Sequence, residues 1–256
     1  MDDDQPLLGG DVTVEESSQK KKFEEYVQPV AAEFLSTAIF VFIATASVVQ
    51  GDIHAIAVAH GFTIAILVIT FGQISGAHIN PAVTLGFIIA GGITWLKAIF
   101  YVLAQLIGGI VGAALTRGML SFQVAGNTTM YEHIKGGGHF LGPGVSVAEG
   151  VLGEIALTTI LVIVILMCAY DSNGTNLLHP LAIGFAIVVD ILAAGGITGG
   201  SMNPARSFGP AVVLSSLSTT LWTNHWIYWV GPAIGACIAG GFYRLIFANN
   251  QKRLFK

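Results

Sequence analysis

The sequence predicts an all-α transmembrane protein, with six membrane-spanning helices and two re-entrant half-helices arranged as an inverted repeat. Two observations carry this prediction. Apolar residues make up 54% of the chain and charged residues only 10%, whereas soluble domains carry about 25% charged residues. In addition, Asn-Pro-Ala occurs twice in this apolar chain, as Asn80-Pro81-Ala82 and as Asn203-Pro204-Ala205, with the two asparagines 123 positions apart.

The spans follow from the lengths of the apolar runs, because a helix needs about 20 mostly apolar residues to cross a bilayer. Six runs qualify: 30–49, 54–72, 96–116, 146–169, 179–196 and 226–248. Two more runs, Pro81 to Ala90 and Pro204 to Leu214, are 10 and 11 residues long. They are too short to cross, so we expect each to dip in from one side, where protein or a watery cavity surrounds its backbone.

Basic residues near the spans predict the orientation. They gather in the two tails and at Lys97, against Arg117 and Lys135 on the other side, so we expect both termini in the cytoplasm. The long connection at about 117–145 is then exterior, and its Asn127-Thr-Thr is a candidate glycosylation sequon. We expect the plasma membrane, with an intracellular membrane such as the inner mitochondrial membrane as the alternative.

An inverted repeat follows from the number of crossings between the two motifs. Three spans separate Asn80 from Asn203, so the two half-helices must enter from opposite faces. Other residues repeat at nearly the same period, among them Glu33 in the first span and Glu154 in the fourth. We therefore divide the chain into a tail at 1–26, expected to be disordered, a membrane domain at 27–248 with halves at about 27–116 and 145–248, and a C-terminal tail at 249–256.

The chemistry of the motifs predicts a pore for neutral solutes. Proline suits the first position of a helix, and the asparagine before it can cap the half-helix while its amide faces a cavity. Two half-helices that meet at their N-termini place two positive dipole ends at one point. A neutral hydrogen-bond acceptor such as water can pass there, whereas a cation or a proton meets a positive barrier. A mere kink in a span explains one such motif but not two in symmetric places.

With paired Asn-Pro-Ala motifs in inverted halves and Arg206 directly after the second, the chain resembles the aquaporin (major intrinsic protein) family. The resemblance runs from about Val27 to Phe247 and implies a homotetramer in the lipid bilayer, with one pore per subunit and no cofactor. It also implies a selectivity filter, which spacing from the asparagines carries onto His60, Ile191, Gly200 and Arg206. Ser207 stands where glycerol-conducting members carry Asp, which argues against glycerol.

The filter set His-Ile-Gly-Arg is similar to that of the aquaporin-8 group and of some plant tonoplast intrinsic proteins. The stretches "YVQP" at 26–29, "VDILA" at 189–193 and "HWIYWVGP" at 225–232 look closer to the aquaporin-8 group. This resemblance implies passage of water, ammonia and hydrogen peroxide.

Each polar residue inside the membrane has a structural alternative. Arg206 could form a salt bridge with Glu33 or Glu154 instead of lining a filter, and His60 could be a packing residue. The two glutamates could relay protons, but their symmetry favours acceptors for the backbone N–H groups of the re-entrant loops. His78, two residues before the first motif, is expected to line the pore entrance, with pH gating as the alternative.

The rival function is a proton-coupled secondary transporter that uses Glu33, Glu154 and Asp190. The sequence leaves the role of Asp190 open.

No enzyme is indicated, because no nucleophile–base pair and no metal-ligand spacing is present. Cys168 and Cys237 both lie in apolar runs, which argues against a disulfide framework or a metal cluster. The acidic N-terminal tail accounts for most of the net charge of −4, so nucleic acid is not an expected partner. Tyr228 is grouped with the neighbouring tryptophans in an interfacial aromatic belt.

Overall fold

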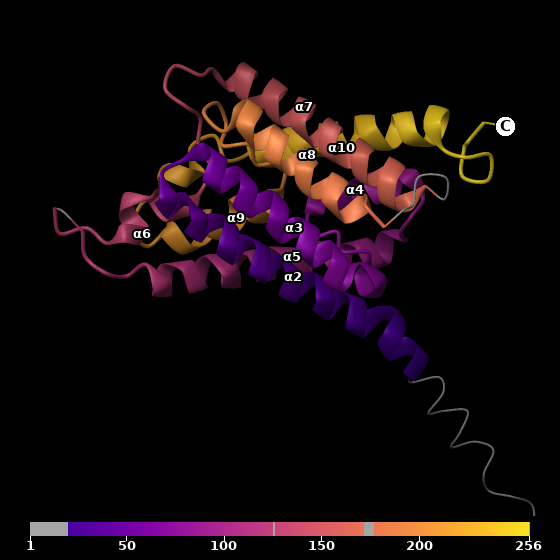
Figure 1. The fold of residues 1–256 in the computed structure, drawn as a ribbon, viewed down its shortest axis with the longest axis horizontal. Helices are drawn as coiled ribbons and strands as arrows, with labels where there is room; N and C mark the ends of the chain where they lie inside the picture. The colour runs from indigo at the N-terminus through magenta and orange to yellow at the C-terminus, as the bar shows by residue number, and fades with distance from the viewer. Residues whose placement is uncertain (1–19, 125, 172–176, 256) are drawn as a thin grey trace, which may run out of the picture.

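The computed structural model describes residues 20–124, 126–171 and 177–255 (Figure 1). The regular secondary structure of these residues is helical, apart from one isolated β-bridge between Gln123 and Thr129. The long helices are α2 (Gln28–Ala46), α3 (Ile53–Ser75), α5 (Trp95–Met119), α7 (Val147–Ile165), α8 (His179–Ala194) and α10 (Ile227–Phe242). The shorter ones are η1 (Phe23–Val27), η2 (Ser47–Gln50), α4 (Pro81–Ala90), α6 (Met130–His133), η3 (Lys135–Gly137), η4 (Leu166–Tyr170), α9 (Pro204–Leu214), η5 (Thr220–Trp222) and η6 (Tyr243–Phe247).

The predicted fold class is confirmed. Five stretches are long and apolar enough to cross a membrane: Lys20–Gln50, Ile53–Ser75, Trp95–Met119, Val147–Tyr170 and Thr220–Phe247. The sixth crossing is α8, whose 16 residues span about 24 Å, less than the roughly 30 Å of a hydrocarbon core. α4 and α9 are the two half-helices, and they lie toward opposite ends of the bundle (Figure 1).

The two ends of the bundle differ in what they carry. The start of the first helix and the C-terminal segment lie at the same end (Figure 1), which we call the terminal face. The opposite end, called the loop face, carries α6 and the connection from residue 120 to 146. α4 lies toward the terminal face and α9 toward the loop face, as expected for an inverted repeat.

The first helix begins inside the segment expected to be the N-terminal tail, residues 1–26. Residues 1–19 lie outside the described part of the chain, but the helix that contains α2 already begins at Lys20. The lysine and glutamate run had suggested a solvated tail, yet these residues have good helix propensity and extend the first span by two turns. At the other end, residues 249–255 turn back on the bundle, where the Leu254 N–H donates to Arg244 O at 2.9 Å.

Glycines allow the long helices to touch at symmetric places. A Cβ on Gly108 of α5 would lie 2.4 Å from Phe34 O on α2, and one on Gly235 of α10 would lie 2.6 Å from Ile155 O on α7. Gly61 and Gly184 face each other between α3 and α8, each with its built Cβ within 2.5 Å of the other's carbonyl oxygen. Close glycine contacts of this kind are typical of helices packed within a membrane.

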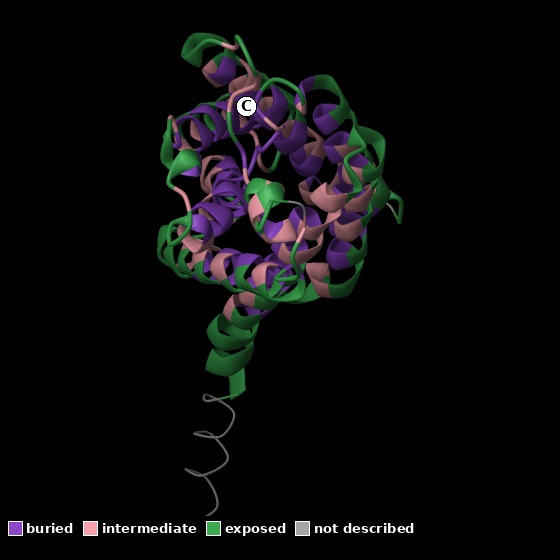
Figure 2. Ribbon diagram, turned by 90° about the vertical axis from the view of Figure 1, so that its left-hand side faces the viewer, coloured by how far each residue is buried: buried purple, intermediate pink, exposed green. Residues whose placement is uncertain are grey.

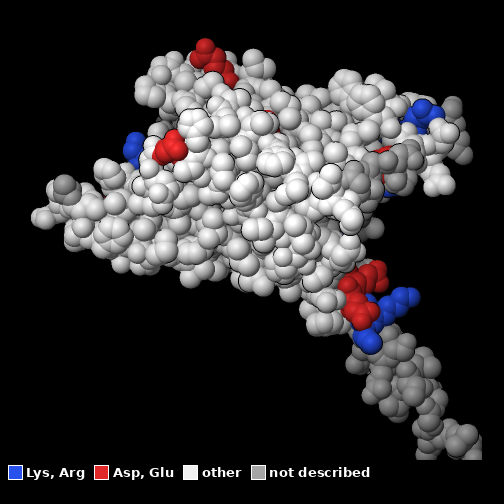
Figure 3. Space-filling model, in the orientation of Figure 1, with Lys and Arg blue, Asp and Glu red and all other residues white. Residues whose placement is uncertain are grey.

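The outer surface is apolar and its charges lie at the two ends. Large apolar side chains such as Leu152, Ile66 and Ile69 are more than 60% exposed, and exposed residues form the outer ring around a buried interior (Figure 2). Figure 3 shows a broad uncharged band between the charged groups at the terminal and loop faces. Such a band suits contact with lipid, because soluble monomers rarely expose a contiguous apolar surface of this extent.

Candidate functional site

The two re-entrant loops have the same backbone conformation. In each loop three residues before the asparagine adopt positive φ, which bulky side chains rarely do. They are Gly76 (φ 88°), Ala77 (φ 48°) and Ile79 (φ 57°) in the first loop, and Gly199 (φ 88°), Gly200 (φ 64°) and Met202 (φ 53°) in the second. A β-branched residue such as Ile79 is strained there, and strain of this kind persists only where the surroundings hold it in place.

Each asparagine caps its half-helix. Asn80 Oδ1 accepts from Ala82 N at 2.8 Å, and Asn203 Oδ1 accepts from Ala205 N at 3.0 Å and Arg206 N at 3.3 Å. Pro81 and Pro204 follow as the first helical residues, where the missing N–H is not needed. The cap thereby fixes the direction in which each side-chain amide points.

Each amide also reaches across to the other loop. Asn80 Nδ2 donates to Met202 O at 2.8 Å, and Asn203 Nδ2 donates to Ile79 O at 2.9 Å. An amide nitrogen carries two hydrogens, so one N–H of each asparagine is left for a solute in the cavity that both residues line.

Glu33 holds the first re-entrant loop from α2. Its Oε1 accepts from Ser75 Oγ at 2.6 Å and from His78 N at 2.9 Å, and its Oε2 accepts from Ile79 N at 2.7 Å and Gln105 Nε2 at 2.8 Å. The carboxylate is fully buried. It therefore satisfies two loop N–H groups that would otherwise be left without acceptors, at a cost of about 1–3 kcal/mol each.

Glu154 of α7 makes the equivalent contacts in the second half. Its Oε1 accepts from Thr198 Oγ1 at 2.7 Å and Ser201 N at 2.9 Å, and its Oε2 accepts from Met202 N at 2.8 Å. The two carboxylates thus bind corresponding backbone groups of the two loops. Neither forms an ion pair with Arg206, for which the described part of the chain supplies no carboxylate partner.

Two tyrosines complete these supports, and sequence reasoning assigned neither of them this role. Tyr101 Oη donates to Ser75 O at 2.8 Å, and Tyr228 Oη donates to Thr198 O at 2.9 Å. Both side chains are 1% exposed. The expectation that Tyr228 belongs to an interfacial belt is therefore wrong, because its hydroxyl is needed by the loop. The sequence feature that could have indicated this role is that Tyr228 in the sixth span corresponds to Tyr101 in the third span.

His60 of α3 and Arg206 of α9 come together on the loop-face side of the two motifs. His60 Nδ1 lies 2.8 Å from Ile56 O, which assigns the hydrogen to Nδ1 and leaves Nε2 as an acceptor. Arg206 Nε and Nη2 each lie 3.4 Å from His60 Nε2, and Nη2 also donates to Ala44 O at 3.4 Å. Both residues are less than 5% exposed.

The other two expected filter residues lie against each other. A Cβ on Gly200 would lie 3.2 Å from Ile191 Cα, and Gly200 has a φ of 64°, so glycine suits both the conformation and the space. Asp190, one residue from Ile191, is buried, and its Oδ2 has no hydrogen-bond partner among the described residues.

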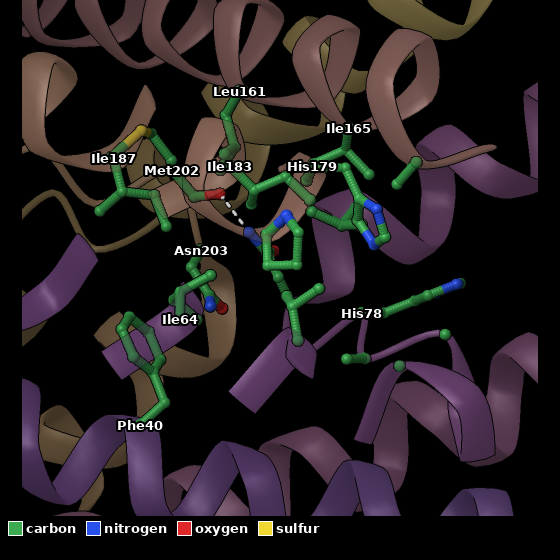
Figure 4. A pocket seen from close by; sticks show the side chains of 18 of the residues that line it. Phe40, Ile64, His78, Leu161, Ile165, His179, Ile183, Ile187, Met202 and Asn203 are labelled. Atoms are coloured by element: carbon green, nitrogen blue, oxygen red, sulfur yellow. Dashed lines mark hydrogen bonds between the residues drawn. The ribbon is translucent and has the colours of Figure 1, made fainter. Parts of the chain in front are cut away.

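Two cavities meet at this constriction. The first, which we call the central cavity, has a volume of about 440 Å³ and runs from His60 and Ile191 past both asparagines to Tyr170 and His179. Figure 4 shows its apolar wall and the Met202 carbonyl that accepts from Asn80. The members of that wall include Phe40, Ile64, Leu161, Ile165, Ile183 and Ile187. The second, which we call the loop-face cavity, has about 410 Å³ and shares His60 and Ile191 with the central cavity, whereas Arg206 lines the loop-face cavity alone. The two shared residues define a path through the bundle with its narrow point at His60 and Ile191, beside Arg206.

His78 lines the central cavity on its terminal-face side, where the sequence placed an entrance. Its Nδ1 lies 3.1 Å from Thr84 Oγ1, and its ring packs 4.3 Å from that of Phe87 and 5.3 Å from that of Tyr101. Figure 4 shows the ring at one side of the cavity. Three neighbours therefore hold the imidazole in place.

His139 lines the loop-face cavity, and sequence reasoning missed it. It follows the three glycines Gly136–Gly138, its Nδ1 lies 2.8 Å from Ser207 Oγ, and it is 6% exposed. Burial lowers the pKa of His139 well below its usual range, so the ring is neutral near pH 7. A single histidine in a glycine-rich loop gives no periodic signal, because only the folded loop brings it to the path.

Within the described ranges, no group of three or more His, Cys, Asp or Glu side chains is placed to hold a metal ion. Cys168 is half-buried and Cys237 is exposed, and both are free thiols.

Asn127, the candidate glycosylation site, lies on an exposed turn of the loop face with a φ of 60°.

An inverted pair of half-helices capped by Asn-Pro-Ala, meeting at one point of a path through an apolar bundle, defines a membrane channel protein. The family model of the major intrinsic protein matches residues 18–243, and the chain belongs to this family, the aquaporins. Aquaporin-8 of Notomys alexis is 37% identical over 237 residues, which cover 91% of this chain and 87% of that protein.

Plant relatives and a solved structure show comparable similarity. A probable aquaporin of TIP type from Medicago truncatula is 40% identical over 233 residues, which cover 86% of each chain. The X-ray structure of the aquaglyceroporin from Plasmodium falciparum superimposes with a TM-score of 0.75 at 25% identity, over 85% of this chain and 95% of that one. The resemblance expected from the motifs is therefore confirmed.

Proposed function

We propose that this aquaporin-family channel passes water, ammonia and hydrogen peroxide passively in both directions and excludes ions and protons. The observation that carries the proposal is the meeting of the central and loop-face cavities at His60 and Ile191, with Arg206 beside them on the loop-face side. His60 Nε2 accepts from Arg206 and helps to hold the guanidinium. Arg206 Nη1 has no hydrogen-bond partner among the described residues, so it can donate to a small neutral solute and replace one of its water contacts. Ile191 and Gly200 leave the opposite side without polar groups.

Exclusion of cations follows from fixed positive charge along the path. Arg206 carries a full charge, and the N-termini of α4 and α9 carry partial positive charges at the asparagines. The amide hydrogens of Asn80 and Asn203 orient water as an acceptor, which works against a proton wire at that point. In this proposal Asn80, Pro81, Ala82, Asn203, Pro204 and Ala205 form the central contact, His60, Ile191, Gly200 and Arg206 form the filter, and His78 lines the entrance.

The further assignments of the proposal concern the setting of the channel. The terminal face is placed in the cytoplasm, so the loop face and Asn127 are exterior and Asn127 is open to glycosylation in a secretory membrane. The chain is placed in the plasma membrane as a homotetramer with one pore in each subunit. Labelling of a cysteine introduced at Ser121 on the loop face by an impermeant reagent in intact cells checks the orientation.

The experiment is an ammonia flux measured as internal pH in proteoliposomes. An inward ammonia gradient alkalinises the lumen, and we expect a faster rise with the wild type than with His60→Phe, because phenylalanine fills the acceptor position and narrows the path. Water efflux is measured on the same vesicles by light scattering. Ammonia rates equal to those of empty liposomes, with water flux intact, would contradict the ammonia part of the proposal alone.

The second candidate function is that of a proton-coupled transporter, which the carboxylates inside the membrane suggest. Glu33 and Glu154 spend their oxygen atoms on loop N–H and hydroxyl donors, which leaves neither free to exchange protons with a solute. Only Asp190 retains an oxygen without a partner among the described residues. Accumulation of solute against its gradient under an imposed pH difference would favour the transporter, and a channel cannot produce it.

A further inference from the structure

The loop-face cavity contains cationic side chains and no carboxylate. Its ionisable lining residues are His60, His133, Lys135, His139 and Arg206. Its remaining walls are apolar side chains, glycines and Pro143. With a volume of about 410 Å³ it is far larger than a single water needs and falls in the range of sites for small ligands.

The acidic residues of the loop face do not line this cavity, and each one caps a helix. They are Asp52 on the His54 and Ala55 N–H groups, Glu132 on the Thr129 N–H and hydroxyl, and Glu149 on the Ser146 N–H and hydroxyl. These hydrogen bonds lower the pKa of the Asp52 and Glu132 carboxyls. The capping arrangement therefore holds the negative charge of this face at the helix starts.

The two strongest cations of the cavity consequently lack counter-ions. Lys135 forms no ion pair with any carboxylate of the described ranges, and its Nζ lies 4.3 Å above the ring of Phe140 at the rim. Arg206 lies at the floor, 2% exposed, with Nη1 buried and without a hydrogen-bond partner among the described residues. A cavity with one cation at its rim and one at its floor has a positive potential that apolar walls concentrate.

We propose that the loop-face cavity binds a small monovalent oxyanion, a carboxylate or a sulfonate, between Lys135 and Arg206, and that the bound anion obstructs the path. The inference rests on the proposed function, because obstruction is read as loss of flux. Oxyanions fit the site because their oxygens accept from ammonium and guanidinium groups in short, charge-assisted hydrogen bonds. A cation gains nothing there, since no carboxylate lines the cavity.

Binding is tested apart from flux, with trifluoroacetate as the probe and detergent-solubilised full-length protein. We expect saturable broadening of the ¹⁹F NMR signal with the wild type and an affinity reduced about tenfold or more in Lys135→Gln. Lys135→Arg restores the charge and is expected to stay near the wild type. Lys21→Gln, which removes an exposed lysine from the terminal face, serves as the matched control and should leave binding unchanged.

Obstruction is tested on water efflux from proteoliposomes, with trifluoroacetate exchanged for chloride at equal osmolarity and each variant normalised to its own anion-free flux. We expect slower efflux for the wild type and Lys21→Gln, and at least about tenfold more anion to reach the same inhibition in Lys135→Gln. Broadening that does not saturate, or equal affinity in Lys135→Gln, would overturn the site. Lysine-dependent binding with unchanged efflux would overturn obstruction, and anion-free flux equal to that of empty liposomes would instead count against the proposed function.

Discussion

Asn80 and Asn203 are bound to each other's loops rather than to each other. The side-chain amide of Asn80 donates to Met202 O, and that of Asn203 donates to Ile79 O. Because both acceptor carbonyls belong to residues at positive φ, the strained turn of one half supplies the acceptor that orients the asparagine of the other. The two halves therefore determine each other's donor geometry at the centre of the path.

Replacing Asn203 by Asp should damage both stability and selectivity. The carboxylate cannot donate to Ile79 O and places negative charge beside a carbonyl oxygen, so we expect a loss of about 1–3 kcal/mol and a lowered barrier to cations. Thermal unfolding in detergent and sodium flux in proteoliposomes measure the two effects. Asn80→Asp is the symmetric variant and should behave alike; cation exclusion unchanged in both would refute the assigned role of the amides.

Glu154→Gln should destabilise the second re-entrant loop. The glutamine amide would turn a donor toward one of the groups that now donate to the carboxylate, so we expect a loss of about 1.5–3 kcal/mol. The control is Glu149→Gln on the same helix, where glutamine can keep the capping box and the loss of charge at the helix N-terminus should cost about 0.3–1 kcal/mol. Unfolding temperatures of the two variants decide the matter: equal losses would show that the buried carboxylate is not a structural support.

Gly112→Ala should disrupt the contact between α2 and α5. The new methyl group would lie 2.4 Å from Ala38 O, which forces the helices apart, and overpacking of this kind costs about 1–3 kcal/mol. Gly118→Ala on the same helix has no neighbour within 4 Å and should be neutral or slightly stabilising. Yield of folded protein and unfolding temperature give the comparison, and equal behaviour of the two variants would contradict the close packing.

Arg206→Val should widen the narrow point and remove its charge. We expect larger neutral solutes such as urea to pass at least several times faster than through the wild type, with water flux retained, because the side chain shrinks and its donors are lost. Light scattering under a urea gradient measures this. Solute selectivity identical to the wild type would exclude Arg206 as a filter residue.

The protonation of His139 predicts how stability depends on pH. Its pKa is lowered in the folded protein, so its contribution is present above about 6.5, the usual value, and falls at lower pH because the unfolded chain binds the proton first. We expect the loss of stability between pH 6.5 and 5 to be smaller in His139→Asn than in the wild type. Unfolding temperatures at a series of pH values test this, and parallel curves would show that the ring is not buried neutral.

The spans and the repeat could be predicted from the sequence because they depend on long apolar runs and on one tripeptide that recurs. Glu33 and Glu154 were recognisable for a similar reason, since intramembrane carboxylates at matching positions are conspicuous. The sequence prediction did not extend the first helix back to Lys20, because the charged residues before residue 27 were interpreted as a disordered tail. Charge indicates that a segment is in contact with solvent, but such a segment can still be helical. Helix propensity continued the span back to Lys20.

The remaining supports of the path lie in residues without a pattern of their own. Tyr228 stands among tryptophans, so its composition suggested an interface, whereas its hydroxyl is fixed by the distant carbonyl of Thr198. His139 reaches Ser207 only through the fold of a glycine-rich connection. A single side chain that contacts a position tens of residues away produces no periodic pattern in the sequence. Such contacts could therefore not be predicted.

The reciprocal bonds of the two asparagines also order events while the chain is being made. Asn80 and its acceptor at Met202 are separated by 122 positions. At about 5–20 residues per second, a ribosome needs roughly 6–24 s to supply the acceptor after the donor has emerged. During that interval the first half lies in the bilayer while Asn80 lacks its acceptor at Met202. It is exposed to membrane quality control until the second half has been synthesised.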